Sequence, residues 1–218
     1  MAFGINDLGA VVGTSTLADG SYVPFLYQNG VMTQLGSGGS GGGLAEAMAI
    51  NNNGQIVGIG ITPSGAFLYQ NGSFIDLGTL GGGSQSQAYA INNLGQVVGF
   101  SHTSGNARHA FLYQNGVMND LDPANSWPDS WAMGINDNGA VVGQISDQNG
   151  MPLAFLYIPG NGIVNLNNYI TNLSNGTTIG FTGAFVAYAI NKNGDIVGAG
   201  NYFNGTKTIQ AGFLLKKQ

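Results

Sequence analysis

The sequence predicts an all-β fold, a five-bladed β-propeller of four-stranded antiparallel blades of about 44 residues, in a single domain over residues 1–218. Three repeated patterns support this prediction. The first is Ile-Asn, a short turn closed by Gly, and an apolar run ending in Gly, in copies that begin at Ile5, Ile50, Ile91, Ile135 and Ile190. The second is an apolar segment close to Phe-Leu-Tyr in each unit, and the third is an Asn-Gly hairpin signal after three of those segments. Units of this size cannot bury a core alone, so the five are expected to pack into one body.

The first predicted strand of each unit precedes the Asn turn and alternates small and bulky residues. Alternation with period two gives one face of Ala or Gly, which suits the crowded inner strand of a blade. The copies are residues 2–5, 47–50, 88–91, 132–135 and 187–190. The apolar run after the turn is the second predicted strand. Asn favours the start of a tight turn and Gly at its end supplies a positive φ, so the two strands should form a hairpin.

The third predicted strand is the Phe-Leu-Tyr segment, which lacks alternation because both of its faces are expected to be covered. Its copies are residues 24–27, 66–69, 110–113, 154–157 and 212–215. The fourth strand is more polar, as an outer strand should be, and its copies are residues 31–35, 73–77, 117–121 and 163–166. The fifth unit lacks this segment, so the last blade should have three strands, with an edge protected by Lys216 and Lys217. A β-solenoid is the alternative, but its coils are usually shorter and lack two reversing turns each.

The composition excludes several classes of partner. Charged residues make up only 7% of the chain and the net charge is −5, so the counterion release that drives nucleic-acid binding is missing. The same balance disfavours anionic membrane surfaces, and no apolar run approaches the length of a membrane span. There are no cysteines, which excludes disulfides and thiolate sites. The N-terminus has no signal segment. Either the protein is not exported by that route or its signal peptide has been removed, and we expect the second, an extracellular or secreted protein.

The chain resembles the bacterial extracellular HAF repeats, called after a His-Ala-Phe signature. The matching segments are His109-Ala110-Phe111, the five Ile-Asn motifs, Asp76 to Gly82, and Phe213-Leu214-Leu215. The likeness covers nearly the whole chain, but the signature His is replaced in the other units by Val23, Gly65, Leu153 and Ala211. A repeated function of that histidine is therefore excluded. The resemblance implies an exported bacterial protein with β-propeller-like repeats and no assigned chemistry.

Variable loops are the expected place for a binding site. The loops between the second and third strands, and those between blades, differ in length and composition, and in a propeller both lie on the face opposite the tight turns. The most distinctive one, residues 122–131, holds both tryptophans, Trp127 and Trp131, whose rings could stack on sugars while Asn125 and Asp129 bind hydroxyls. The alternative is that the two rings only cap the open end of a blade.

A second candidate loop, residues 101–109, brings Asn106, Arg108 and His109 together. A metal would need a third ligand at a fixed spacing and none is evident, so we expect no metal and no cofactor. A solvated hydrogen-bonding loop is the simpler interpretation.

The sequence gives little support for an enzymatic function. Glycoside hydrolysis needs a pair of carboxylates, yet the chain has one glutamate, Glu46, and its aspartates fall mostly in turns or outer strands. An axial hydrolase is therefore the weakest hypothesis. The sequence favours a non-enzymatic binding module with lectin-like recognition of a carbohydrate or cell-surface glycan on the variable-loop face. A structural or protein-interaction scaffold with no small-molecule ligand is the alternative.

Overall fold

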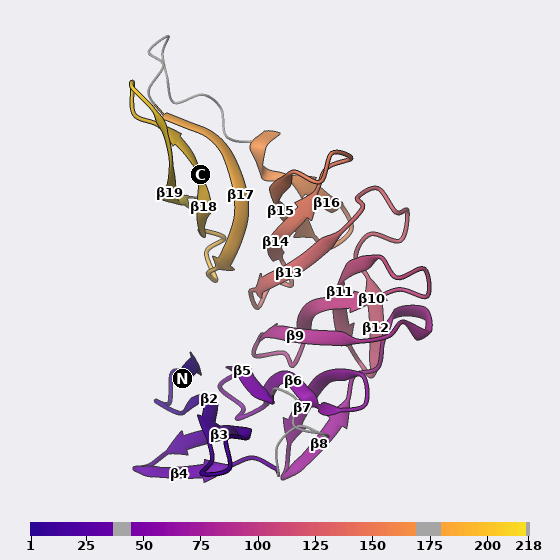
Figure 1. Cartoon of the computed structure of the whole chain (residues 1–218), viewed down its shortest axis with the longest axis vertical. Helices are drawn as coiled ribbons and strands as arrows, with labels where there is room; N and C mark the ends of the chain where they lie inside the picture. The colour runs from indigo at the N-terminus through magenta and orange to yellow at the C-terminus, as the bar shows by residue number, and fades with distance from the viewer. Residues whose placement is uncertain (37–44, 169–179, 217–218) are drawn as a thin grey trace. The chain divides into compact units, whose positions relative to one another are not determined.

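The computed structural model describes residues 1–36, 45–168 and 180–216, and it confirms an all-β protein (Figure 1). In these ranges 19 strands form five antiparallel sheets, four with four strands and one with three, each in chain order. Two single turns of 3₁₀ helix, Leu80–Gly82 and Leu166–Asn168, are the helical elements of the described residues. Parts of two predicted variable loops, residues 37–44 and 169–179, lie outside the described residues. No helix in the described part of the chain has the length and apolar character needed to span a membrane.

The chain divides into two compact units, Met1–Asp120 and Leu121–Gln218. The first unit contains three sheets: β1 (Ala2–Ile5), β2 (Val11–Thr16), β3 (Tyr22–Gln28) and β4 (Val31–Gln34); β5 (Glu46–Ile50), β6 (Ile56–Thr62), β7 (Gly65–Gln70) and β8 (Ser73–Asp76); and β9 (Ser86–Ile91), β10 (Val97–His102), β11 (Arg108–Gln114) and β12 (Val117–Asp120). The second unit contains two sheets: β13 (Ser130–Ile135), β14 (Val141–Ser146), β15 (Pro152–Ile158) and β16 (Gly162–Asn165); and β17 (Gly180–Ile190), β18 (Ile196–Phe203) and β19 (Thr208–Leu215).

The two predicted tight turns are confirmed. Gly54 closes the turn between β5 and β6 with φ 75°, and its equivalents in the other four sheets also have positive φ. Asn71 and Gly72 join β7 to β8 with φ values of 51° and 79°. Positive φ at both central residues is the mark of a type I′ hairpin. The local sequence therefore sets the strand register through both turns.

The first strand of each sheet contains a β-bulge that the alternating pattern did not predict. In the second sheet, Ala47 and Ala49 pair with consecutive residues, Gly58 and Val57, so Met48 is the extra residue. The bulge explains why the apolar run ends in Gly. A Cβ on Gly58 would clash with the Glu46 carbonyl oxygen and lie 2.8 Å from the Phe67 ring. Only Gly leaves room for both the bulged strand and the aromatic side chain.

Neighbouring sheets within a unit pack face to face along contacts that we call seams. Each sheet has a leucine face, defined in the first sheet by Val12, Leu26 and Leu35. The opposite face, which we call the aromatic face, carries Ile50, Phe67 and Tyr69 in the second sheet. The leucine face of one sheet packs on the aromatic face of the next in all three seams within the units, between sheets one and two, two and three, and four and five.

The repeated Asn residues join the sheets across these seams. Oδ1 of Asn51 accepts the N–H groups of Asn53 and Gln55 in its own turn. Its Nδ2 donates to the backbone carbonyl of Asn92, the equivalent residue of the next sheet, at 2.9 Å. Asn6 donates to Asn51 and Asn136 to Asn191 in the same way, both at 3.0 Å. One side chain therefore fixes its own turn and bonds its sheet to the next one.

The last sheet has three strands, as predicted. Its strand order is β17, β18, β19, so β19 lies at the sheet edge among the described residues (Figure 1). In the four other sheets the equivalent third strand pairs with a fourth strand. The last sheet thus differs from the others at the position where a fourth strand would lie.

Candidate functional site

A groove lined by amides lies across the seam between the second and third sheets. Its volume is about 420 Å³, and it is lined by Asn53, Gly54, Gln55, Gln70, Asn71, Asn93 and Leu94. The residues come from both tight turns of the second sheet and from the Asn turn of the third sheet. Five of the seven are Asn or Gln and none is charged, so the groove offers hydrogen bonds without net charge.

The hydrogen bonds behind this groove fix the direction of its amides. Because Oδ1 of Asn51 accepts backbone N–H groups, its Nδ2 must be the donor, and it donates to Oε1 of Gln55 at 2.7 Å. The Nε2 of Gln55 in turn donates to Oε1 of Gln70 at 2.8 Å. Gln70 is left with its Nε2 donor group, which has no partner among the described residues. We call the chain Asn51, Gln55 and Gln70 an amide relay; it starts at backbone N–H groups and ends at a donor on the groove wall.

The third sheet contains the same amide relay. Asn92 donates to Oε1 of Gln96 at 2.6 Å, and Gln96 donates to Oε1 of Gln114 at 2.8 Å. Oδ1 of Asn92 accepts the N–H groups of Leu94 and Gln96, so the polarity is the same. The first and fourth sheets carry Ala10 and Ala140 in place of the central Gln. Two of the five sheets therefore present an equivalent Nε2 donor, at Gln70 and Gln114.

The tryptophan loop, residues 122–131, is organised by a buried carboxylate. Asp122, 5% exposed, accepts the backbone N–H groups of Ser126 at 3.1 Å and Trp127 at 2.9 Å. Asn125 has φ 55° and is exposed. Sequence reasoning missed Asp122, although an Asp followed by Pro at the start of a loop is a typical turn signal.

Both tryptophan side chains are half-buried. Trp127 lies in the loop and Trp131 in β13, where it pairs with Gln144, and Asp129 is half-buried beside them in sequence. The Asp129 carbonyl accepts the N–H of Ser146 at 2.9 Å. Partial burial of this kind suits either a cap or a ligand contact.

The second predicted cluster is divided between a turn and a strand. Asn106 occupies the β10–β11 turn with φ 66°, and its Oδ1 lies 3.0 Å from Nδ1 of His102. Arg108 and His109 belong to β11 instead of the loop. His109 is 3% exposed, with Nδ1 2.8 Å from the Asp120 carboxylate and Nε2 buried without a partner among the described residues. A side chain so deeply buried does not reach a ligand at the surface.

These two predicted clusters lie in different units. The first unit holds Asn106, Arg108 and His109, and the second holds Asn125, Trp127, Asp129 and Trp131. The structure brings the residues of the tryptophan loop together and separates His109 from the surface. The amide groove was missed because the notable residues, Gln55 and Gln70, stand 15 apart in separate hairpins.

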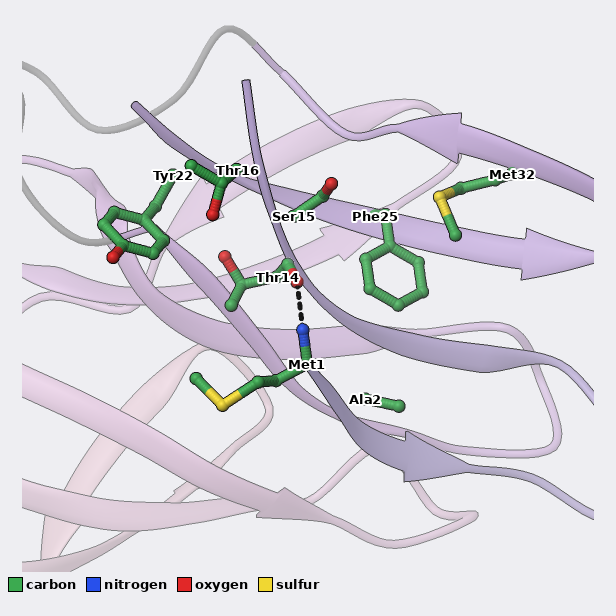
Figure 2. A pocket seen from close by; sticks show the side chains of 8 residues that line it. All are labelled: Met1, Ala2, Thr14, Ser15, Thr16, Tyr22, Phe25 and Met32. Carbon is green, nitrogen blue, oxygen red and sulfur yellow. Dashed lines mark hydrogen bonds between the residues drawn. The ribbon is translucent and has the colours of Figure 1, made fainter. Parts of the chain in front are cut away.

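A further pocket of about 350 Å³ lies on the first sheet (Figure 2). Ser15, Thr16 and Tyr22 supply hydroxyl groups, while Phe25 and Met32 supply apolar surface. The amino group of Met1 donates to the Thr14 carbonyl at 2.6 Å, which extends the pairing of β1 with β2 (Figure 2). Phe25 and Met32 belong to the aromatic face of the first sheet, the kind of face that packs against a neighbouring sheet in the seams described above.

Three titratable groups among the described residues have shifted pKa values. Among the described residues, no group of three or more His, Asp or Glu is placed to hold a metal ion. Hydrogen bonds from Ser21 lower the pKa of Asp19, and the Met151 N–H lowers the pKa of Asp147. Burial raises the pKa of Tyr89. All three shifts have local structural causes, and none of these groups lines a pocket described above.

Neither the protein-family models nor the curated proteins compared with this chain give a match.

Proposed function

We propose that the protein is a non-enzymatic carbohydrate-binding module and that the amide groove is its binding site. The observation that carries the proposal is the relay from Asn51 through Gln55 to Gln70, whose polarity is fixed by backbone N–H groups. A fixed donor suits a ligand oxygen at a defined place. Sugars combine many hydroxyl and acetal oxygens with apolar C–H surfaces, and Leu94, 69% exposed, supplies an apolar wall.

The lining favours a neutral ligand over an ionic one. Neither a cationic side chain for phosphate or carboxylate nor an acidic one for amines is present in the groove lining. The volume of about 420 Å³ falls within the usual range for small-ligand sites, roughly 300–1,000 Å³. The equivalent relay at Gln114 adds a second donor of the same polarity, so binding at more than one place is expected. The tryptophan loop remains a separate predicted binding region, because in a propeller the variable loops lie on the face opposite the tight turns that line the amide groove.

We infer that the five sheets are blades of one five-bladed β-propeller, an exported protein of the HAF-repeat type. This inference is supported by two sheet faces that pack on no neighbouring sheet within their own units and are complementary in kind. The first sheet has an exposed aromatic face, with Ile5 and Met32, and the last sheet has an exposed leucine face, with Val197 and Leu214. Faces of these two kinds cover each other in every seam within the units, so a closed ring would bury both.

Glycan-array screening followed by titration calorimetry tests the function. We expect saturable binding of a neutral glycan, with a stoichiometry above one, and a loss of about tenfold in affinity for Gln70→Ala at its site. Gln28→Ala is the matched control, because Gln28 occupies the equivalent turn position in a sheet that lacks the central Gln. Equal effects of both substitutions would contradict the groove assignment. No binding to any glycan would favour the alternative of a scaffold without a small-molecule ligand.

A further inference from the structure

Two side chains of the amide groove carry unpaired groups of fixed direction, one an acceptor and one a donor. The acceptor belongs to Asn53, whose Nδ2 donates to the backbone carbonyl of Asn93 at 2.8 Å, across the seam between the second and third sheets. Since a carbonyl oxygen can only accept, this bond assigns the two ends of the Asn53 carboxamide. Its Oδ1 accepts no hydrogen bond from the described residues, and the side chain is exposed in the groove lining.

The donor is Nε2 of Gln70, at the end of the amide relay. Gln70 is the last residue of β7, whereas Asn53 lies in the turn between β5 and β6, so the two groups come from different hairpins of the second sheet. Leu94 of the third sheet is exposed and lines the same groove. The groove therefore offers a donor, an acceptor and an apolar surface on three separate side chains.

These three features match the parts of an acetamido group. Its carbonyl accepts a hydrogen bond, its N–H donates one and its methyl group is apolar, and the planar amide holds the N–H and the carbonyl on separate atoms that face in opposite directions. A hydroxyl group has its hydrogen and its lone pairs on one oxygen, so it satisfies both protein groups only by lying close to both. A charged amine has no acceptor for Gln70, and the groove lining contains no acidic side chain to balance its charge.

The other sheets of the first unit do not combine these groups. Gln114 ends the second amide relay with the same donor, but in the third sheet Leu94 occupies the turn position that Asn53 occupies in the second. The first sheet has Leu8 at this position and Ala10 in place of the central Gln of the relay. Among the three sheets of this unit, the second alone has both the relay donor and the Asn acceptor.

We propose that the amide groove recognises the acetamido group of an N-acetylated sugar, with Gln70 donating to the acetyl carbonyl, Asn53 accepting from the N–H and Leu94 contacting the methyl group. This inference rests on the proposed function and narrows it from neutral glycans to N-acetylated ones. A site built around an N–H and a carbonyl rejects an analogue that lacks them, because its own polar groups then lose their partners. The relay at Gln114 supplies only the donor and should not make this distinction.

Pairs of sugars that differ only in carrying an acetamido or a hydroxyl group test the inference. N-acetylglucosamine against glucose, and N-acetylgalactosamine against galactose, are titrated with the full chain in ligand-observed NMR. We expect at least one N-acetylated sugar to bind about tenfold more tightly than its parent hexose, with the strongest saturation transfer at the acetyl methyl protons. Equal affinities within both pairs, or binding of other neutral glycans but of neither N-acetylated sugar, would overturn the inference and leave the proposed function intact. No binding of any glycan would overturn both.

A substitution at the donor should change which sugar is preferred. In Gln70→Glu one carboxylate oxygen still accepts from Gln55, and the other replaces the donor at the groove wall. The preferred N-acetylated sugar should then bind about tenfold more weakly, while its amine analogue, a cation, should bind more tightly than it does to the parent protein. Gln28→Glu adds the same charge at the equivalent position of the first sheet and is the matched control, with no effect expected.

A substitution at the acceptor should remove the discrimination. Asn53→Leu introduces the residue that the third sheet carries at this turn position, so the N-acetylated sugar and its parent hexose should bind with equal affinity. The Tm of each variant, measured in parallel, checks that the fold persists. An unchanged preference in both Gln70→Glu and Asn53→Leu would place the acetamido group outside this groove and would overturn the inference.

Discussion

Nδ2 of Asn51 donates to the backbone carbonyl of Asn92 at 2.9 Å, across one full repeat of the chain. The same side chain, 4% exposed, closes its own turn by accepting two N–H groups. Repetition of Asn at this position is therefore explained by two tasks that a carboxamide performs at once, because it carries a donor and an acceptor. No other side chain of this length offers both.

Removal of this carboxamide should destabilise the protein. Asn51→Ala removes the hydrogen bond to the Asn92 carbonyl and the acceptor of the turn N–H groups, and we expect a loss of about 2 kcal/mol in the free energy of unfolding. Asn51→Asp keeps the acceptor for the turn but removes the donor across the seam, so it separates the two tasks. Denaturant midpoints measure both. A stable Asn51→Asp variant would show that the seam bond contributes little.

Two glycines of the second sheet should respond differently to substitution. At Gly54 a Cβ meets no atom within 4 Å, so Gly54→Ala costs only the positive φ, about 1 kcal/mol. At Gly58 a Cβ clashes with backbone and with Phe67, so Gly58→Ala should cost about 3 kcal/mol. Gly54→Asn is the control, because Asn tolerates positive φ and should cost less than Gly54→Ala. Equal losses for the two alanine variants would argue against the bulge explanation.

The tryptophan loop offers a test of cap against ligand contact. Asp122→Ala removes the acceptor of two backbone N–H groups and should cost about 1–2 kcal/mol, with a red shift in tryptophan emission. Trp127→Ala should reduce glycan affinity if the ring contacts the ligand. A large stability loss without any change in binding would instead assign both rings to the cap. Chemical denaturation and glycan titration on the same variants distinguish the outcomes.

If the proposed propeller is closed, the leucine face of the last sheet should be covered by the first sheet. Leu214 is 55% exposed on the leucine face, and a charge at such a position ordinarily changes stability by less than about 0.5 kcal/mol. If the face is covered by the first sheet, Leu214→Asp should cost about 2 kcal/mol or more. Ile5→Asp on the opposing face should behave alike, whereas Met151→Asp should be neutral. Neutral behaviour of all three variants would contradict a closed ring.

Acid should change the structure of the loop that contains Asp147. The N–H groups of Met151 and Asn149 bond to Asp147 and lower its pKa below 3.8. A lowered pKa means that the contribution to stability is present above the unfolded value and is lost as pH falls through the folded value. The Met151 amide resonance should therefore shift only below about pH 4. Asp147→Asn keeps an acceptor that does not titrate, and an unchanged acid shift in that variant would exclude Asp147 as its source.

Much of the fold followed from local sequence. The turns at Gly54 and at Asn71-Gly72 were predictable because positive φ restricts residue choice. The bulge at Met48 was not, since the alternating pattern reads identically with and without an extra residue. The reason for Gly58 was likewise hidden, because it depends on a neighbouring strand and on Phe67 from a third one.

The site was less predictable than the fold. Distinctive residues drew attention to Trp127 and His109, yet His109 is buried against Asp120. The amide relay consists of common residues that become special only through the direction of their hydrogen bonds. Gln55 and Gln70 meet because two hairpins of one sheet lie side by side, a relationship that no single segment encodes.

The Asn contacts across the seams also have a consequence for the conditions that the protein tolerates. Carboxamides neither take up nor release protons across the biological pH range, and a bond between two neutral groups gives dissolved salt little to screen. With only 7% charged residues in the chain, these Asn contacts between neighbouring sheets should depend little on acidity and ionic strength. Neighbouring sheets joined in this way should therefore stay packed in brine, in dilute water and in mild acid alike.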